Sequence, residues 1–148
     1  HEQVPPKVVS SKVEGCPSLK FVIVVYSAPC SSEGCLSALR FTEAVLAEGH
    51  EILRVFFYHD GVYTANKLIA APQDEADVAA MWQTLGQTNG LDLVACIASC
   101  LRRGIVDSTE AARYEKAADN LREGFTISGL GQLIEASLNA DRVVTFGH

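Results

Sequence analysis

The sequence predicts an α/β fold of three layers, in which helices cover both faces of a mainly parallel sheet of about five strands. Runs of apolar, β-branched residues alternate along the chain with segments of helical periodicity, which is the pattern of a doubly wound sheet. The first run, residues 21–26, is continuously apolar, as is typical of a strand buried on both faces. With 148 residues, the chain is long enough for one domain with a substantial core.

A helix is expected after the first strand. Ala38, Phe41 and Val45 recur at helical spacing, and Gly49 follows as a residue that ends helices. The next apolar run, residues 52–57, is the second predicted strand. Together these elements make one strand–helix–strand unit, which requires the two strands to run parallel.

The middle of the chain repeats this alternation. Residues 58–63 are predicted as a loop with a turn at Asp60 and Gly61. Residues 91–98 are the third predicted strand, which leads into a short turn over residues 100–104. The helix between them is indicated by apolar residues spaced three and four apart, namely Val78, Met81, Trp82 and Leu85.

The last third of the chain supplies two helices and a fourth strand. Asp107 with Glu110 resembles a capping pair for a helix over residues 109–118. Residues 125–127 form a short strand, and Ser128 is expected to cap the helix that follows. The apolar face of that last helix consists of Leu130, Leu133, Ile134 and Leu138.

The chain closes with a strand over residues 142–146. Because the carboxyl ends of parallel strands meet at one edge of a sheet, three segments are expected there together. These are the loop over residues 27–34, the loop over residues 58–63 and the segment that follows Cys96. Functional residues are therefore expected in these three segments.

Residues 1–19 differ from the remainder, because they contain three of the five prolines and no helical period. We expect an extended arm or a disordered tail there, and the folded domain over residues 20–148. Cys16 lies in that tail and is assigned no catalytic role. The tail shows no apolar stretch of a signal peptide, and the chain has no run of about 18 apolar residues. A cytoplasmic protein that does not enter the membrane is expected.

The charge distribution argues against direct binding of nucleic acid. The formal net charge is −6, and the basic residues are scattered apart from Arg102 and Arg103. Proteins that bind DNA or RNA directly usually present a basic face. An acidic chain of this kind can still act on nucleic acid through partner proteins.

The cysteine pattern indicates neither a disulfide framework nor a metal site. The number of cysteines is odd, and their spacings lack the close pairs and histidine partners of zinc sites. No metal ligand is therefore predicted. The five cysteines are Cys16, Cys30, Cys35, Cys96 and Cys100.

Residues 92–104 are the most informative segment. A strand ends near Cys96, and Arg102, Arg103 and Gly104 follow within eight residues. A thiol reacts as its thiolate, which nearby positive charge or a helix N-terminus stabilises. Cys96 is therefore the candidate nucleophile. The alternative is that Cys96 is only a small apolar core residue, and that the two arginines face solvent or pair with Asp107.

Two further sets of residues are weaker candidates. His59 is expected at the same edge, where it could orient a partner, although single histidines in loops are often plain surface residues. Cys100 follows Cys96 by four residues, so a helical turn would place both thiols on one face, where a disulfide would be strained. Cys30 and Cys35 are either a regulatory or resolving pair, or a pair without function.

Other chemistries lack their motifs. Neither G-x-G-x-x-G nor GK[ST] follows the first strand, so a flavodoxin-like site for flavin or nucleotide is disfavoured. No nucleophile elbow of the form G-x-S-x-G occurs either. No cofactor is predicted.

Four separated blocks carry a resemblance to a known family. The chain resembles the TusD/DsrE family, the sulfur-relay subunits of the TusBCD and DsrEFH complexes, from Lys20 to Gly147. The blocks are residues 20–25, residues 55–62, residues 96–107 without Ser99 and Cys100, and residues 127–133 with 140–147. The resemblance implies a DsrEFH-like, flavodoxin-like sheet and a cysteine, matching Cys96, that accepts sulfane sulfur as a persulfide. The family pattern has no cysteine at the position of Cys100.

The resemblance also implies partners. In the Tus branch, a TusA-like protein donates sulfur and a TusE-like protein accepts it, and the sulfur ends as 2-thiouridine at the tRNA wobble position. In the Dsr branch, sulfur is exchanged with a DsrC-like protein during sulfur oxidation. Both imply a heterohexamer with paralogous TusB- and TusC-like, or DsrH- and DsrF-like, subunits. We favour the Tus branch and keep open the Dsr branch, a non-catalytic scaffold subunit and a flavodoxin-like binding protein.

Overall fold

The computed structural model describes residues 7–9, 17–30 and 33–147. Five strands form one sheet, each pairing with its neighbours in parallel, in the order β4-β3-β2-β1-β5. The strands are β1 (Lys20–Val25), β2 (Glu51–Phe57), β3 (Leu93–Cys96), β4 (Phe125–Ser128) and β5 (Arg142–Phe146). The predicted parallel α/β fold is confirmed, and the carboxyl ends of all five strands lie at one edge.

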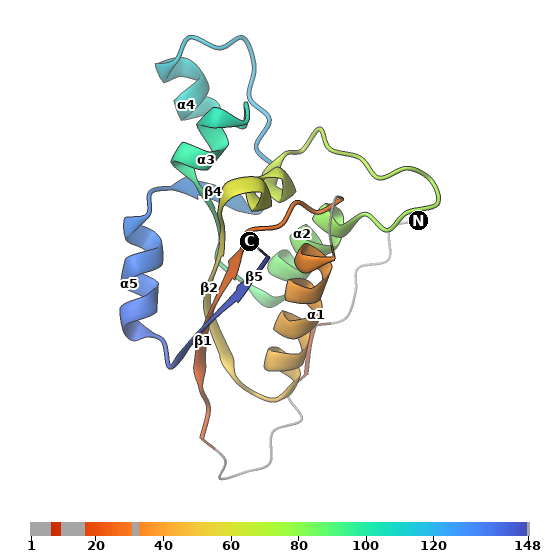
Figure 1. The fold of residues 1–148 in the computed structure, drawn as a ribbon, viewed down its shortest axis with the longest axis vertical. Coiled ribbons are helices and arrows are strands. Elements are labelled where there is room, and N and C mark those ends of the chain that lie inside the picture. The colour runs from red at the N-terminus through yellow and green to blue at the C-terminus, as the bar shows by residue number, and fades with distance from the viewer. Residues whose placement is uncertain (1–6, 10–16, 31–32, 148) are drawn as a thin grey trace.

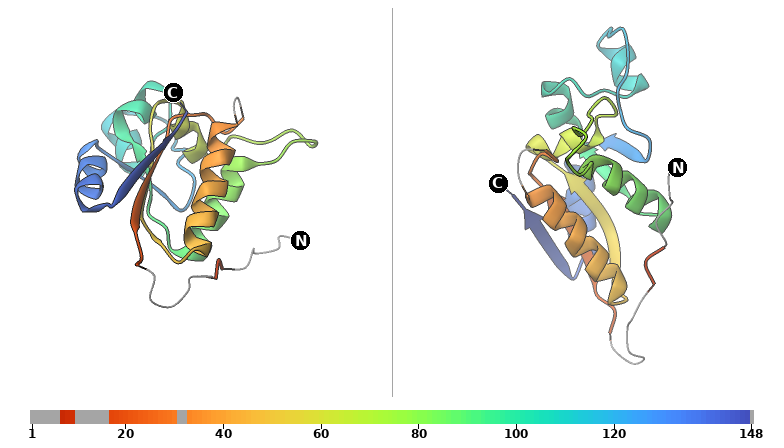
Figure 2. Two further views of the ribbon diagram at one scale, coloured as in Figure 1. Left: turned by 60° about the horizontal axis from the view of Figure 1, so that its bottom comes forward. Right: turned by 90° about the vertical axis from the view of Figure 1, so that its right-hand side faces the viewer.

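Helices on two sides of the sheet give the three layers (Figure 1). The helices α1 and α2 cover one face, and α5 covers the other, as the left view of Figure 2 shows. The short helices α3 and α4 lie beyond the carboxyl edge of the sheet instead of on either face. The helices are α1 (Gly34–Ala47), the 3-10 helix η1 (His59–Ala65), α2 (Val78–Asn89), α3 (Ile97–Arg102), α4 (Ser108–Arg113) and α5 (Gly131–Asn139).

The main core lies between the sheet and the helices α1 and α2. Trp82 of α2 is fully buried, packs edge-to-face on Phe57, and donates its indole N–H to the backbone carbonyl of Cys35 across 3.1 Å. In β1, alternate residues turn to opposite faces: Ile23 joins this core, whereas Val22 joins a smaller cluster under α5. The continuous apolar run of β1 is thus explained by burial on both sides.

Two sets of tertiary contacts attach α5 and the segment around Val8 to the rest of the fold. Arg54 of β2 donates to Asp92 across 2.7 Å and to the backbone carbonyl of Gln132 across 2.8 Å, which ties α5 to the sheet. On the other side, Val8 packs against the core cluster, and its backbone N–H donates to the Asn89 side chain across 3.1 Å. Cys16 lies outside the described residues.

Three predicted boundaries around the carboxyl edge are wrong. The predicted loop over residues 58–63 is the 3-10 helix η1, because Val62, Thr64 and Ala65 are buried there and hold the segment in a helical turn. The third strand ends at Cys96, two residues earlier than predicted, and the predicted turn that follows is the helix α3. The strand stops there because its pairing with β2 ends at Ala95 and its pairing with β4 ends at Cys96.

Two helix predictions also need correction. Asp107 caps α4 as predicted, accepting from the Glu110 backbone N–H across 2.8 Å, but the helix ends at Arg113 and not at residue 118. Glu115 adopts a left-handed conformation with φ of 54°, which stops a helix. Ser128 is not the cap of α5: it is the last residue of β4, and Leu130 precedes α5 without any side-chain cap.

Candidate functional site

Cys96 lies where β3 ends and α3 begins. It is the last residue of the strand, and it precedes the first turn of the helix as its N-cap residue. In the parallel register it lies opposite Ser128 at the end of β4. The thiol is therefore at the carboxyl edge of the sheet, where α/β proteins place their sites. Cys96 is nevertheless only 3% exposed.

One face of α3 carries the polar and thiol groups of this region. Ser99 and Cys100 follow Cys96 by three and four residues, and Arg103 follows Ser99 by four and Cys100 by three. This spacing places the four residues along one stripe of the helix. This stripe faces η1, because η1 contacts both β3 and α3. The stripe and η1 meet in a seam that begins at Cys96.

Two interactions join the two sides of the seam. The Ser99 hydroxyl accepts a hydrogen bond from the backbone N–H of His59 across 3.0 Å. Arg103 Nε donates to Asp60 Oδ1 across 2.9 Å, while its Nη1 donates to the Ser99 backbone carbonyl across 3.1 Å. Ser99 is 1% exposed, so its hydroxyl is positioned by the surrounding core. Adjacent residues of η1 are thus bound to adjacent turns of α3.

His59 is exposed and lies at this edge, as predicted. Its φ is 49°, in the left-handed region that few residues other than glycine occupy. The imidazole stacks on Tyr26, with ring centres 5.4 Å apart, and meets Tyr58 edge-on at 4.2 Å. Tyr26 and Tyr58 follow β1 and β2, so the three rings form an aromatic cluster at the carboxyl edge.

The two arginines differ in their surroundings. Arg103 is paired with Asp60, not with Asp107, so the alternative pairing considered from the sequence is wrong. Arg102 is exposed. Arg103 therefore joins α3 to η1, whereas Arg102 is exposed to solvent.

Cys100 and Cys35 are buried thiols held in their protonated forms. Burial raises the pKa of Cys100 to about 12; the neighbouring Cys96 raises it further and Arg103 opposes the shift. Burial likewise raises the pKa of Cys35 to about 11, while a hydrogen bond with Thr64 across 3.5 Å lowers it. Neither thiol is suited to react as a thiolate near neutral pH.

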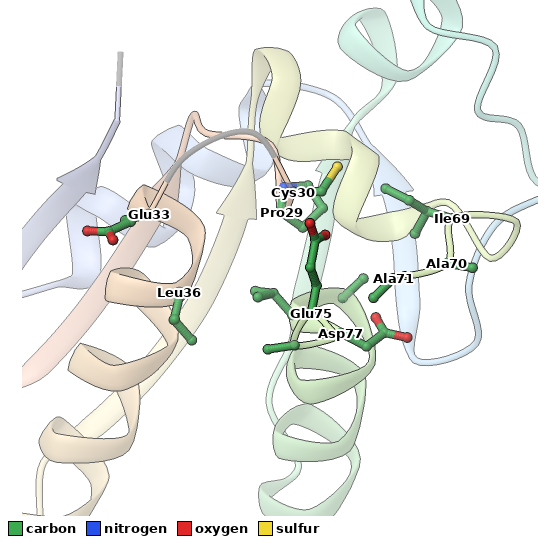
Figure 3. A pocket seen from close by; sticks show the side chains of 12 residues that line it. Pro29, Cys30, Glu33, Leu36, Ile69, Ala70, Ala71, Glu75 and Asp77 are labelled. Carbon is green, nitrogen blue, oxygen red and sulfur yellow. The ribbon is translucent and has the colours of Figure 1, made fainter. Parts of the chain in front are cut away.

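Cys30 lies in a different place. It is exposed and borders a cavity of about 540 Å³ between the loop after β1, the start of α1 and the segment that leads into α2 (Figure 3). Glu33, Glu75 and Asp77 also border this cavity, whereas Cys96 and His59 do not. The structure thus separates Cys30 from the seam, and Cys35 points into the core.

Two residues of the seam were not predicted. Ser99 was passed over although it follows Cys96 by three residues, the interval that puts two residues on one helix face. The sequence marks Asp60 as a turn residue and as part of a family block, without assigning it a contact. No signal in the sequence pairs Asp60 with Arg103, which lies 43 residues further along the chain.

The described part of the chain contains neither a metal-binding cluster nor a membrane-spanning helix. Over residues 7–9, 17–30 and 33–147, no group of three or more His, Cys, Asp or Glu side chains is arranged to hold a metal ion. In the same residues, no helix has the length and apolar character needed to span a membrane.

This chain is similar to a protein family and to a solved structure. The family model described as the DsrE/DsrF-like family matches residues 19–146. Among solved structures, the crystal structure of the ychN protein from E. coli superposes with a TM-score of 0.70 at 25% sequence identity. That match covers 86% of this chain and 99% of the E. coli chain. The similarity therefore extends over most of this chain.

Proposed function

Because this chain belongs to the DsrE/DsrF-like family, a family related to sulfur relay, we propose that it is a sulfurtransferase subunit that carries sulfane sulfur as a persulfide on Cys96. The position of Cys96 supports this proposal more than any other observation. Of the four cysteines that the structure describes, Cys96 is the one at the carboxyl end of a strand, on the helix face that carries Ser99 and Arg103. Burial raises the pKa values of Cys35 and Cys100, which makes both thiols poor nucleophiles.

The proposed step is a transfer of one sulfur atom between thiols. The Cys96 thiolate attacks the outer sulfur of a persulfide carried by the donor protein. A bond forms between Cys96 Sγ and that sulfur, the sulfur–sulfur bond of the donor breaks, and the donor leaves as a thiolate. The transferred sulfur keeps its oxidation state, so the step requires no oxidant, reductant or organic cofactor. The same step with an acceptor thiolate discharges Cys96.

The wider pathway is part of the proposal. In its preferred form, a TusA-like protein supplies sulfur and a TusE-like protein receives it, for 2-thiouridine formation at the tRNA wobble position. In the alternative form, the chain is a DsrE-like subunit that exchanges sulfur with a DsrC-like protein in dissimilatory sulfur oxidation. The net charge of −6 fits either form, because the chain then contacts proteins and not tRNA. Free thiols of this kind persist in the reducing cytoplasm, where we place the chain.

The seam residues have supporting roles in this proposal. The guanidinium of Arg103 holds Asp60 at the edge of the site. Arg102 is exposed and can bind a carboxylate of an incoming partner. His59 presents its imidazole at the same edge, next to two tyrosines, where it can orient the partner's thiol.

An apolar face supports assembly with subunits of the same fold. On α5, Ile134 is 56% exposed and Leu138 is 82% exposed, although both are large apolar side chains. Val143 of the neighbouring edge strand β5 is also exposed, in register with the buried Val22. Exposed apolar patches of this kind are typical of interfaces. We propose that this face contacts a paralogous subunit in a heterohexamer.

The second candidate function is a scaffold subunit that does not carry sulfur. The burial of Cys96 favours it, because a relay thiol must be reached by its partners. Replacing Cys96 by Ser in the reconstituted complex separates the two functions, with Cys30→Ser as the matched control. Loss of sulfur relay in Cys96→Ser alone supports the carrier. Relay that persists in Cys96→Ser contradicts the carrier and leaves the scaffold.

A further inference from the structure

We propose that His59 and Asp60, at the start of η1, form a latch that closes over Cys96 and must release before sulfur is transferred. The inference rests on the proposed function in one respect, namely that Cys96 is the sulfur carrier. Its physical basis is independent of that function: a nucleophile at the edge of a sheet is almost fully buried, and the start of η1 is bound to the helix that follows this nucleophile through one hydrogen bond and one ion pair.

The need for a latch follows from the burial of Cys96. Attack on a persulfide requires the two sulfur atoms and the leaving sulfur to come into line, so both partners must reach each other. A side chain that is 3% exposed does not admit a second protein thiol. Cys96 ends β3, precedes α3 and pairs with β4, and η1 contacts both β3 and α3. Of these, the strands are fixed in the sheet ladder.

The start of η1 lies between two residues that are held in the core. Phe57, which precedes it, is fully buried at the end of β2. Gly61, which follows it, is pressed so closely against the backbone of Val25 that a Cβ would overlap the Val25 carbonyl. Between them, His59 and Asp60 are exposed. The two exposed residues can therefore move while the rest of η1 stays in the core.

Two interactions bind the latch to α3. One is the hydrogen bond from the His59 backbone N–H to the Ser99 hydroxyl, at 3.0 Å. The other is the ion pair of Asp60 with Arg103, at 2.9 Å, in which the Asp60 side chain is 62% exposed. Each is an interaction of modest strength, since one is a single hydrogen bond and the other is screened by solvent.

The backbone of the latch favours its release. His59 has φ of 49°, a conformation that costs free energy in a residue with a side chain. The closed state keeps this conformation because Ser99 binds its N–H and Tyr26 stacks on its ring. Breaking the contacts to α3 removes the reason for that conformation. Release of the latch would therefore relieve this backbone strain.

The rate at which iodoacetamide alkylates Cys96, followed by mass spectrometry of peptides, tests the latch in the full-length protein. The variants are Ser99→Ala and Asp60→Asn, and rates are compared after extrapolation to full ionisation of the thiol. We expect each variant to raise the Cys96 rate about five-fold, as the loss of one ordinary hydrogen bond would. Asp119→Asn, which removes the surface ion pair with Lys67, is the matched control and leaves the rate unchanged.

The other cysteines separate a local opening from general loosening. Exposed Cys30 reports the intrinsic reagent rate, and buried Cys35 reports the whole fold. The latch predicts that Cys96 alone accelerates. It is overturned if Cys96 does not accelerate in either variant, or if Cys35 accelerates in parallel with it.

Salt gives a second readout. Raising the ionic strength from about 0.01 M to about 1 M shortens the screening length from about 30 Å to about 3 Å. Cys96 of the wild type is expected to react faster at high salt, and Cys96 of Asp60→Asn is not. Equal salt dependence in both proteins contradicts the latch. Alkylation needs no sulfur donor, so it tests the latch independently of sulfur transfer. If the alkylation rates agree with the latch but Cys96 never accepts sulfur, the proposed function is refuted and the latch is not.

Discussion

Cys100 lies one turn of α3 after Cys96, on the same face of the helix, yet it is fully buried and its pKa is raised to about 12. A second thiolate so close to a persulfide on Cys96 would normally destroy it, because the thiolate can attack the persulfide and release sulfide. Burial keeps Cys100 protonated and so prevents this attack. The helix thus holds a second cysteine beside the proposed carrier without giving it a reactive form.

The first prediction concerns Cys100 itself. Because a protonated thiol is a poor nucleophile, Cys100→Ala is expected to keep the sulfur loading of Cys96 within about two-fold of the wild type. Loading is measured by mass spectrometry after incubation with a sulfur donor. A loss of loading in a variant that is still folded, judged by circular dichroism, would show that Cys100 takes part in the transfer.

The second prediction is a loss of stability at alkaline pH. Between its ordinary pKa of 9.0 and about 12, Cys100 keeps its proton in the folded state and loses it on unfolding. The unfolded state then binds fewer protons, so stability falls as pH rises, by about 1.4 kcal/mol per pH unit for one such group. Below pH 9 the effect vanishes.

Urea unfolding in the presence of a reductant measures this effect. Cys35 contributes in the same direction between 9.0 and about 11. The free energy of unfolding of the wild type is therefore expected to fall more steeply than that of Cys100→Ala between about pH 9 and about pH 11. Parallel curves for the two proteins would mean that Cys100 ionises in the folded state as easily as in the unfolded chain.

The third prediction concerns the close approach of η1 to β1. Gly61→Ala is expected to destabilise the fold by about 3 kcal/mol or more, because its Cβ has no space next to the Val25 carbonyl. Gly129→Ala is the matched control, since no atom lies near the position of its Cβ. Thermal or urea unfolding compares the two. Equal stability of the two variants would show that η1 is not pressed against β1 in solution.

The fourth prediction concerns the apolar face of α5. Replacing Ile134 and Leu138 together by Gln is expected to reduce the assembly to smaller species, since both side chains lose their apolar contacts with a partner subunit. Light scattering after size-exclusion chromatography measures the mass. Leu68→Gln, at another exposed apolar residue, is the control and leaves the mass unchanged. An unchanged mass in the double variant would place the interface elsewhere.

The sheet could be predicted because its strands carry their own signals. A continuous apolar run such as Phe21 to Val25 requires burial on both faces, and the alternation with helices then requires parallel pairing. The edge that holds Cys96 follows from that topology alone. The predicted DsrE-type family and its fold were confirmed, since they rest on blocks spread over most of the chain.

The details of the seam could not be predicted because they depend on pairings distant in sequence. Where β3 ends is set by the length of its partners, so Ser128, which looks like a helix cap, pairs with Cys96 instead. The sequence suggests that Arg103 stabilises the thiolate, with solvent or Asp107 as the alternative, whereas in the structure it pairs with Asp60 from another element. The burial of Cys96 likewise depends on the packing of elements distant in sequence, so it became visible only in three dimensions.

The most direct test of the central proposal is mass spectrometry of the assembled complex after incubation with a cysteine desulfurase, cysteine and a TusA-type carrier, with mapping of peptides. We predict that the peptide containing Cys96 gains the mass of one sulfur atom, and that the sulfur moves on to a TusE-type or DsrC-type acceptor. No adduct on Cys96, or an adduct on Cys30 or Cys35 in its place, would contradict the account.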